Sequence, residues 1–208
     1  MVEPYYQDES CTIYNGDCRE ILPTLGRFDL LLTDPPYGIG FAASPTLWQR
    51  LAGAKPEEWD NIIPDASTIS ECIAAASDSV LWGGNYLGLP AARCFLSWVK
   101  PDSPPSMGSV EYAWTSFDAN SKHIIHSISA TNKERVGHPT QKPLAVIRWC
   151  LTFAPSAQTI LDPFMGSGTT LVAAKLEGRR AVGIEISERY CEIAVNRLRQ
   201  RVLNFNEE

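Results

Sequence analysis

The sequence predicts an α/β protein with an open, mostly parallel β-sheet and helices on both faces. Short apolar runs alternate with amphipathic segments of helical length, which is the pattern of repeated strand–helix units. The run FDLLLTDPP (28–36) is almost continuously apolar until two prolines stop it, as is typical of a strand buried on both faces. With 208 residues, 44% hydrophobic and 20% charged, we expect a single globular domain over 1–208.

The elements of the first half follow from local patterns. Strands are expected at Thr12–Asp17, 28–36, Val80–Trp82, Cys94–Val99, Glu111–Phe117 and Ile124–Ser129. The segment CREILPTL (18–25) is typical of a short helix, and Ser67 is expected to cap a helix that ends near Ser77. Residues 38–65 show no lasting period, so we expect a long loop there with a helical turn near Leu47–Leu51.

The second half alternates more regularly. Helices are expected at Pro143–Ala154, at Ser167–Glu177 and from Ser187 to about Leu203, and strands at Gln158–Leu161 and Ala181–Ile186. Proline suits the first helical position, Gly178 is a typical helix terminator and Ser187 a typical cap, so these bounds have a physical basis.

Composition excludes several classes of protein. No apolar run approaches the ~18 residues of a membrane span, and the polar start MVEPYYQDES is unlike a secretory signal. Six scattered cysteines without a Cys-x-x-Cys pair indicate reduced thiols in a cytoplasmic protein. His123 and His126 fall in an expected strand and would face opposite sides, so no metal site is expected.

Two features of the second half point to a nucleotide-like ligand. The segment DPFMGSGTT (162–170) follows a strand and opens a helix, and its glycines let the backbone approach a bound molecule; an ordinary tight turn is the alternative. Glu185 ends the next strand, 23 residues after Asp162, close to the ~20-residue interval at which a carboxylate meets ribose hydroxyls. Spacing and strand end favour ribose binding over an ordinary edge acid.

A third motif, Asp34-Pro35-Pro36-Tyr37, ends the buried strand of the first half. Open α/β sheets bind ligands at that edge. The prolines lack N–H groups, which leaves carbonyl acceptors beside the Asp34 carboxylate and the Tyr37 ring. Such a group suits an exocyclic amino group on a planar base, whereas a proline-stiffened turn capped by Asp34 is the structural alternative.

Together these motifs resemble those of the amino-group DNA methyltransferases, which use S-adenosylmethionine to modify adenine N6 or cytosine N4. Four ordered segments carry the resemblance: NGDC (15–18), DPPY (34–37), HPTQKP (138–143) and DPFMGSGTT (162–170). The catalytic motif precedes the cofactor motif, as in the permuted β-type arrangement. The resemblance implies a Rossmann-like, doubly wound, circularly permuted fold whose mostly parallel seven-stranded sheet has one antiparallel strand.

The resemblance also implies roles for individual residues. Asp34 and the Pro35 carbonyl would accept hydrogen bonds from the target amine, next to Pro36, and Tyr37 would stack on a base flipped out of the duplex. The implied cofactor-binding residues are Asp17 for the adenine, Glu185 for the ribose, Thr140 and Lys142 for the carboxylate, and Asp162, Phe164, Gly166, Ser167, Gly168 and Thr169 for the methionine end.

Double-stranded DNA is the implied substrate, and the Asp-Pro-Pro-Tyr motif favours adenine N6. The alternatives are an N4-cytosine enzyme and an inactive subunit that binds S-adenosylmethionine. The net charge of −6 argues against a broadly basic surface, so we expect phosphate contacts from the local +3 of 131–150 and from the loop with Arg50 and Lys55. Trp48 and Trp59 in that loop would stack beside the flipped base or belong to the core.

Room for reading a DNA sequence is short. The 100 residues between Tyr37 and His138 must also supply three or four strands, which leaves 38–66 and 118–138 as DNA-facing loops and no separate recognition domain. We therefore expect either a short or relaxed DNA recognition sequence or help from a partner in a homodimer. No membrane contact is expected. The small size resembles that of phage or prophage enzymes.

Overall fold

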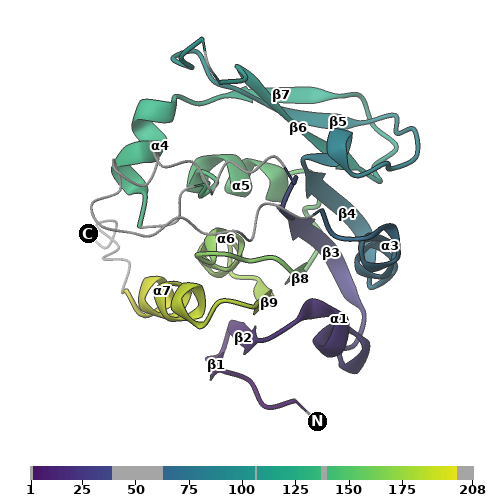
Figure 1. The fold of residues 1–208 in the computed structure, drawn as a ribbon, viewed down its shortest axis with the longest axis vertical. Helices are drawn as coiled ribbons and strands as arrows, with labels where there is room; N and C mark the ends of the chain where they lie inside the picture. Colours follow the sequence, from purple (N-terminus) through teal and green to yellow (C-terminus); the bar gives the residue numbers. More distant parts are fainter. Residues whose placement is uncertain (1, 39–62, 106, 137–139, 201–208) are drawn as a thin grey trace.

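The computed structural model describes residues 2–38, 63–105, 107–136 and 140–200. Within these residues the chain forms a nine-stranded sheet in the order β1-β2-β9-β8-β3-β4-β6-β5-β7 (Figure 1). The strands are β1 (Tyr6–Gln7), β2 (Cys11–Asn15), β3 (Phe28–Thr33), β4 (Ala76–Trp82), β5 (Phe95–Val99), β6 (Val110–Thr115), β7 (Lys122–Ile125), β8 (Thr159–Asp162) and β9 (Arg180–Glu185).

The strand directions confirm the predicted, mostly parallel sheet. β2, β9, β8, β3 and β4 are parallel neighbours, and β6 runs antiparallel between β4 and β5. The sheet has nine strands where the resemblance implied seven. β1, which was not expected, pairs antiparallel with β2 at one edge, and β7, which overlaps the strand expected at Ile124–Ser129, pairs parallel with β5 at the other. β8 and β9, which come late in the sequence, lie between β2 and β3 in the sheet. This strand order agrees with the circularly permuted fold that the resemblance implied.

Helices cover both faces of the sheet. They are α1 (Cys18–Ile21), α3 (Ala66–Ala74), α4 (Ile128–Glu134), α5 (Leu144–Leu151), α6 (Thr169–Leu176) and α7 (Glu188–Arg199). Figure 1 shows α5, α6 and α7 on one side of the sheet and α1 and α3 on the other. Alternate residues of β3 point to opposite faces of the sheet. Leu30 and Leu32 pack in the core beneath α5, α6 and α7, whereas Leu31 packs with α1 and α3.

Several element bounds differ from the sequence prediction, and three of the differences have a clear physical cause. Asp65, not Ser67, caps α3, because its Oδ1 accepts the Thr68 N–H at 2.7 Å. Sheet pairing with β3 starts β4 at Ala76, where a helix was expected to continue. The expected strand Ile124–Ser129 ends at Ile125, because Ser127 caps α4 by accepting the Ala130 N–H at 3.0 Å.

The six cysteines are free and buried, as their apolar surroundings predicted. Burial raises the pKa of the Cys11, Cys72 and Cys191 thiols to about 12. In the ranges that the structure describes, no helix has both the length and the apolar character needed to span a bilayer.

Candidate active site

The parallel strands end at one edge of the sheet, and a cavity of about 1390 Å³ lies along it. The cavity brings together most of the predicted site residues, namely Asp17, Asp34, Pro35, Pro36, Tyr37, Thr140, Lys142, Asp162, Phe164, Gly166, Ser167, Thr169 and Glu185. Gly168 does not line the cavity. It has a left-handed backbone (φ 77°), and a Cβ there would lie 2.7 Å from Ala194 Cβ, so this glycine lets α7 pack closely.

Asp34 and Tyr37, just beyond β3, are in direct contact. The Tyr37 hydroxyl donates a hydrogen bond to Asp34 Oδ1, and Tyr86 stacks on the Tyr37 ring with centroids 5.3 Å apart. Gly83, after β4, has φ 68°, and a Cβ at this position would lie 1.9 Å from Tyr37 Cε1. The missing side chain at Gly83 therefore makes the space that the Tyr37 ring occupies.

Lys142 is engaged differently from the expectation that it binds the cofactor carboxylate. Its Nζ lies 2.6 Å from Asp34 Oδ2, 3.2 Å from the Tyr37 hydroxyl and 3.1 Å from Glu111 Oε2, and the side chain is 7% exposed. An ammonium has three N–H donors, so these contacts account for all of them. Lys142 is thus placed to act on Asp34 rather than on a separate anion.

The sequence analysis missed Glu111 and Lys100. Lys100 Nζ donates to Glu111 Oε1 at 2.7 Å and is 5% exposed. The antiparallel direction of β6 brings its first residues to the edge where the parallel strands end, and β5 ends there too. We call Asp34, Lys142, Glu111 and Lys100 the buried charge cluster; its two acids and two bases balance.

Burial and ion pairing act against each other on the two carboxyls of this cluster. Burial raises the pKa of Asp34 above its ordinary value, although the Lys142 ammonium opposes that rise. Burial also acts to raise the pKa of Glu111, but the Lys142 and Lys100 ammoniums outweigh it and hold that pKa below the ordinary value. Glu111 is therefore the more firmly ionised of the two acids.

Asp162 ends β8 inside the protein, next to Asp34 and the cavity. Its Oδ1 accepts hydrogen bonds from Thr33 Oγ1 at 2.7 Å and from the Phe164 N–H at 3.2 Å. Burial raises the pKa of the Asp162 carboxyl to about 6, although these hydrogen bonds act to lower it.

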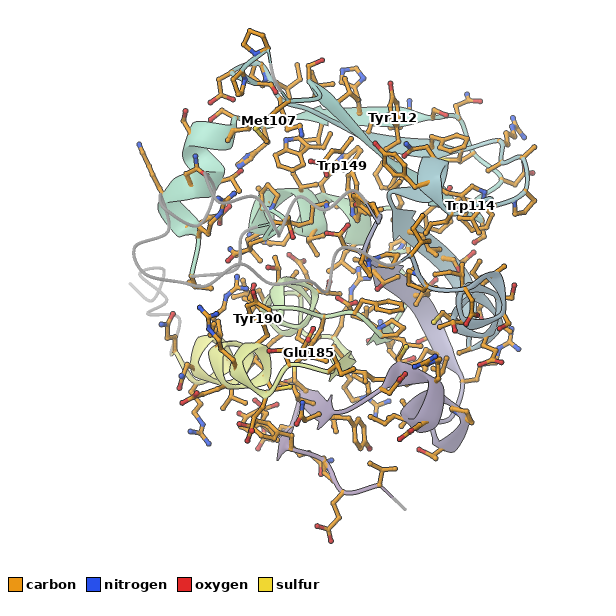
Figure 2. The ribbon with its side chains drawn as sticks, viewed as in Figure 1. Met107, Tyr112, Trp114, Trp149, Glu185 and Tyr190 are labelled. Carbon is orange, nitrogen blue, oxygen red and sulfur yellow. The ribbon has the colours of Figure 1, made fainter. Side chains whose placement is uncertain are left out.

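Glu185 and Asp17 line the same cavity as Asp34 and Asp162. We call the edge of the sheet that carries these four carboxyls the acidic edge. Figure 2 shows Glu185 at the end of β9, just before α7. Its Oε2 accepts the Gly166 N–H at 3.0 Å and its Oε1 the Ser187 N–H at 2.8 Å, so the glycine-rich turn orients the carboxylate. Asp17 caps α1 and pairs with Arg19, whose hydrogen bond lowers the pKa of the Asp17 carboxyl.

Arg135, which follows α4, is another cation on the cavity wall, besides Arg19, Lys100 and Lys142. Its buried Nε meets no hydrogen-bond partner in the described part of the chain, and burial lowers its pKa. Gln141 ties this segment to the glycine-rich turn, because it accepts the Val136 N–H at 3.0 Å and lies 3.5 Å from Ser167 Oγ. Within the described ranges, the Arg135 Nε on this wall is therefore open to an anionic ligand.

Two of the four basic side chains expected to form a cluster in 131–150 make ion pairs within the protein. Lys142 belongs to the buried charge cluster, and Arg148 Nε donates to Glu177 at 2.7 Å. Lys133 is exposed, so it remains a candidate for a phosphate contact. Over the described ranges, no group of three or more His, Cys, Asp or Glu side chains could hold a metal ion. The residues Trp48, Arg50, Lys55, Trp59, His138, Pro139 and Leu203 lie outside the described residues.

Comparison with known proteins gives the following relatives. A family model for N6/N4 enzymes, described as "DNA methylase", matches residues 96–196. The Type II methyltransferase M.ScaI of Streptomyces caespitosus is 30% identical over an alignment of length 256, which covers 94% of this chain and 84% of the relative. The Type II methyltransferase M2.DpnII of Streptococcus pneumoniae is 50% identical over an alignment of length 249, which covers 95% of this chain and 93% of the relative.

Solved structures share the fold. The crystal structure of an M1.HpyAVI–SAM complex superposes with a TM-score of 0.62 at 24% identity, covering 91% of this chain and 99% of that one. The cytosine-N4-specific PvuII DNA methyltransferase superposes with a TM-score of 0.61 at 16% identity, covering 99% and 91%.

Proposed function

Because the chain belongs to the DNA methylases that modify adenine N6 or cytosine N4, we propose that it methylates the N6 amine of adenine in double-stranded DNA. One observation carries the proposal: the Asp34 carboxylate, the Tyr37 ring and the Glu185 carboxylate line the same cavity. A cavity with both features has room for a methyl donor beside a planar base.

The residues of the cavity fit S-adenosylmethionine, which supplies an electrophilic methyl group when bound. Glu185 would hold the ribose hydroxyls, and the backbone of the Gly166 turn lies next to it. Asp17 would accept the amino group of the cofactor adenine. Thr140 and Arg135 would bind the cofactor carboxylate, since Arg135 Nε meets no hydrogen-bond partner among the described residues and Lys142 is engaged by Asp34.

In the proposed mechanism, hydrogen-bond acceptors of the protein activate the target amine. The lone pair of an adenine amine is shared with the ring, so the amine is a poor nucleophile. Asp34 and the Pro35 carbonyl would accept its two N–H groups and draw the lone pair out of conjugation, while Tyr37 stacks on the flipped base. Holding amine and methyl in line supplies much of the remaining rate. None of the buried cysteines is required as a nucleophile.

The test is to incubate the protein with DNA and methyl-labelled S-adenosylmethionine and to separate the nucleosides after digestion. We expect N6-methyladenine. N4-methylcytosine would reassign the target base, and cofactor binding without transfer would indicate an inactive subunit. Asp34→Asn should lower kcat at least ~10²-fold. Asp78→Asn, near the start of β4 and away from the cavity, removes a carboxylate that accepts the Ser116 hydroxyl at 3.3 Å and should leave kcat unchanged. An active Asp34→Asn protein would refute the acceptor role.

A further inference from the structure

The carboxylate of Asp34 already has a donor on each oxygen. The Tyr37 hydroxyl donates to Oδ1 and the Lys142 ammonium donates to Oδ2 at 2.6 Å. A carboxylate engaged by an ammonium is a weaker acceptor for a neutral amine, because the same lone pairs serve the stronger donor. The target base must therefore share Asp34 with Lys142.

Lys142 has a second carboxylate within reach. Glu111 Oε2 lies 3.1 Å from Lys142 Nζ, and the other Glu111 oxygen accepts from Lys100 at 2.7 Å. Lys100 and Lys142 are 5% and 7% exposed, and the Asp34 and Glu111 side chains 25% and 28%, so water screens these ion pairs only in part. The Lys142 ammonium is thus divided between Asp34 and Glu111, and Lys100 sets how strongly Glu111 competes.

We propose that Glu111 is a positioning residue for the methyl-transfer site, which holds the Lys142 ammonium partly away from Asp34 and so leaves Asp34 able to accept the target amine. The inference rests on the proposed function of Asp34 and goes beyond it, since it adds a lysine shared between two carboxylates and a fourth residue, Lys100, that tunes the sharing. Neither Glu111 nor Lys100 touches the reacting atoms in this scheme.

The scheme makes two substitutions act in opposite directions on Asp34. The titratable groups that face Asp34 among the described residues are Tyr37 beyond β3, Lys142 before α5, Glu111 in β6 and Asp162 at the end of β8. Glu111→Gln removes both a negative neighbour and the competitor for Lys142, so the pKa of Asp34 falls. Lys100→Gln removes a positive charge and strengthens the hold of Glu111 on Lys142, so the pKa of Asp34 rises.

The direct test is a carboxyl ¹³C NMR titration of the full chain, with the Asp34 resonance assigned by Asp34→Asn. We expect the Asp34 midpoint to move down by about one pH unit in Glu111→Gln and up by about one unit in Lys100→Gln. Glu177→Gln, which removes the exposed carboxylate paired with Arg148, should leave the midpoint unchanged. Midpoints that stay constant, or that move in the same direction in both variants, would overturn the inference. If Glu111→Gln does not fold, the upward shift in Lys100→Gln decides.

Methyl transfer gives a second readout. Glu111→Gln should lower kcat about tenfold and move the acid limb of its pH profile down, while KM for S-adenosylmethionine stays the same. A residue that only packs would lower stability without moving that limb. A wild-type protein that transfers no methyl group would refute the proposed function, and the titration would still decide whether Glu111 and Lys100 control Asp34.

Discussion

Replacing Gly83 with alanine tests whether the position of the Tyr37 ring limits activity. A Cβ at residue 83 would lie 1.9 Å from Tyr37 Cε1, whereas ordinary contact begins at 3.4 Å, so the ring must retreat by about 1.5 Å. That retreat would break the hydrogen bond to Asp34 and the stacking on Tyr86. A misplacement of ~1 Å at a reacting group can cost ~10²-fold, so we expect kcat to fall at least ~10²-fold.

Gly178→Ala is the matched control. Gly178 has the same φ of 68°, but a Cβ there meets nothing within 4 Å. The left-handed backbone costs ~1–2 kcal/mol in either variant, which corresponds to a melting temperature about 2–8 °C lower. Initial rates of methyl transfer, thermal unfolding and calorimetry with S-adenosylmethionine separate the effects. Both variants should bind the cofactor normally. If Gly83→Ala methylates DNA as fast as Gly178→Ala, the steric reasoning is refuted.

Three further predictions concern the cofactor side of the cavity. Glu185→Gln should raise the calorimetric Kd for S-adenosylmethionine about 10–100-fold, because charge-assisted hydrogen bonds to the ribose are lost; an unchanged Kd would remove Glu185 from the site. Arg135→Gln should raise the same Kd about tenfold, whereas Arg148→Gln should leave it unchanged. An unchanged Kd in Arg135→Gln would show that its guanidinium does not contact the ligand. The pKa of Asp162 is about 6 in the fold against 3.8 for an ordinary Asp, so the stability linked to its protonated form is present below pH 3.8 and lost as the pH rises through 6. Between pH 4 and pH 8 the free energy of unfolding in urea should therefore fall by up to ~3 kcal/mol more in the wild type than in Asp162→Asn. Parallel pH profiles of the two proteins would contradict the burial argument.

The acidic edge could be predicted from sequence because each of its residues follows a local signal. Asp34, Asp162 and Glu185 each stand at the end of an apolar run, and parallel strands place such ends together. Gly168 shows the limit of this reasoning. The motif indicates that a glycine is needed at this position, but only the packing shows that a Cβ there would meet Ala194 in α7.

Glu111 and Lys100 could not be predicted in the same way. Their contact depends on β6 running antiparallel to β4, and strand direction is decided by tertiary pairing rather than by residue type. The start of β4 has the same cause. Residues 76 and 77 were expected to continue the helix that precedes them, yet pairing with β3 makes them part of a strand.

The pairing of β2 with β9 has a consequence for the order in which the molecule assembles. Asn15 Nδ2 donates to the backbone oxygen of Glu185 at 2.9 Å across 170 residues of chain. During synthesis β3, β4, β5 and β6 can pair with one another long before β9 leaves the ribosome, whereas β2 must wait for it. We expect the half that carries Asp34 and Tyr37 to mature first, so that a nascent chain acquires its acceptor site before it can hold a methyl donor.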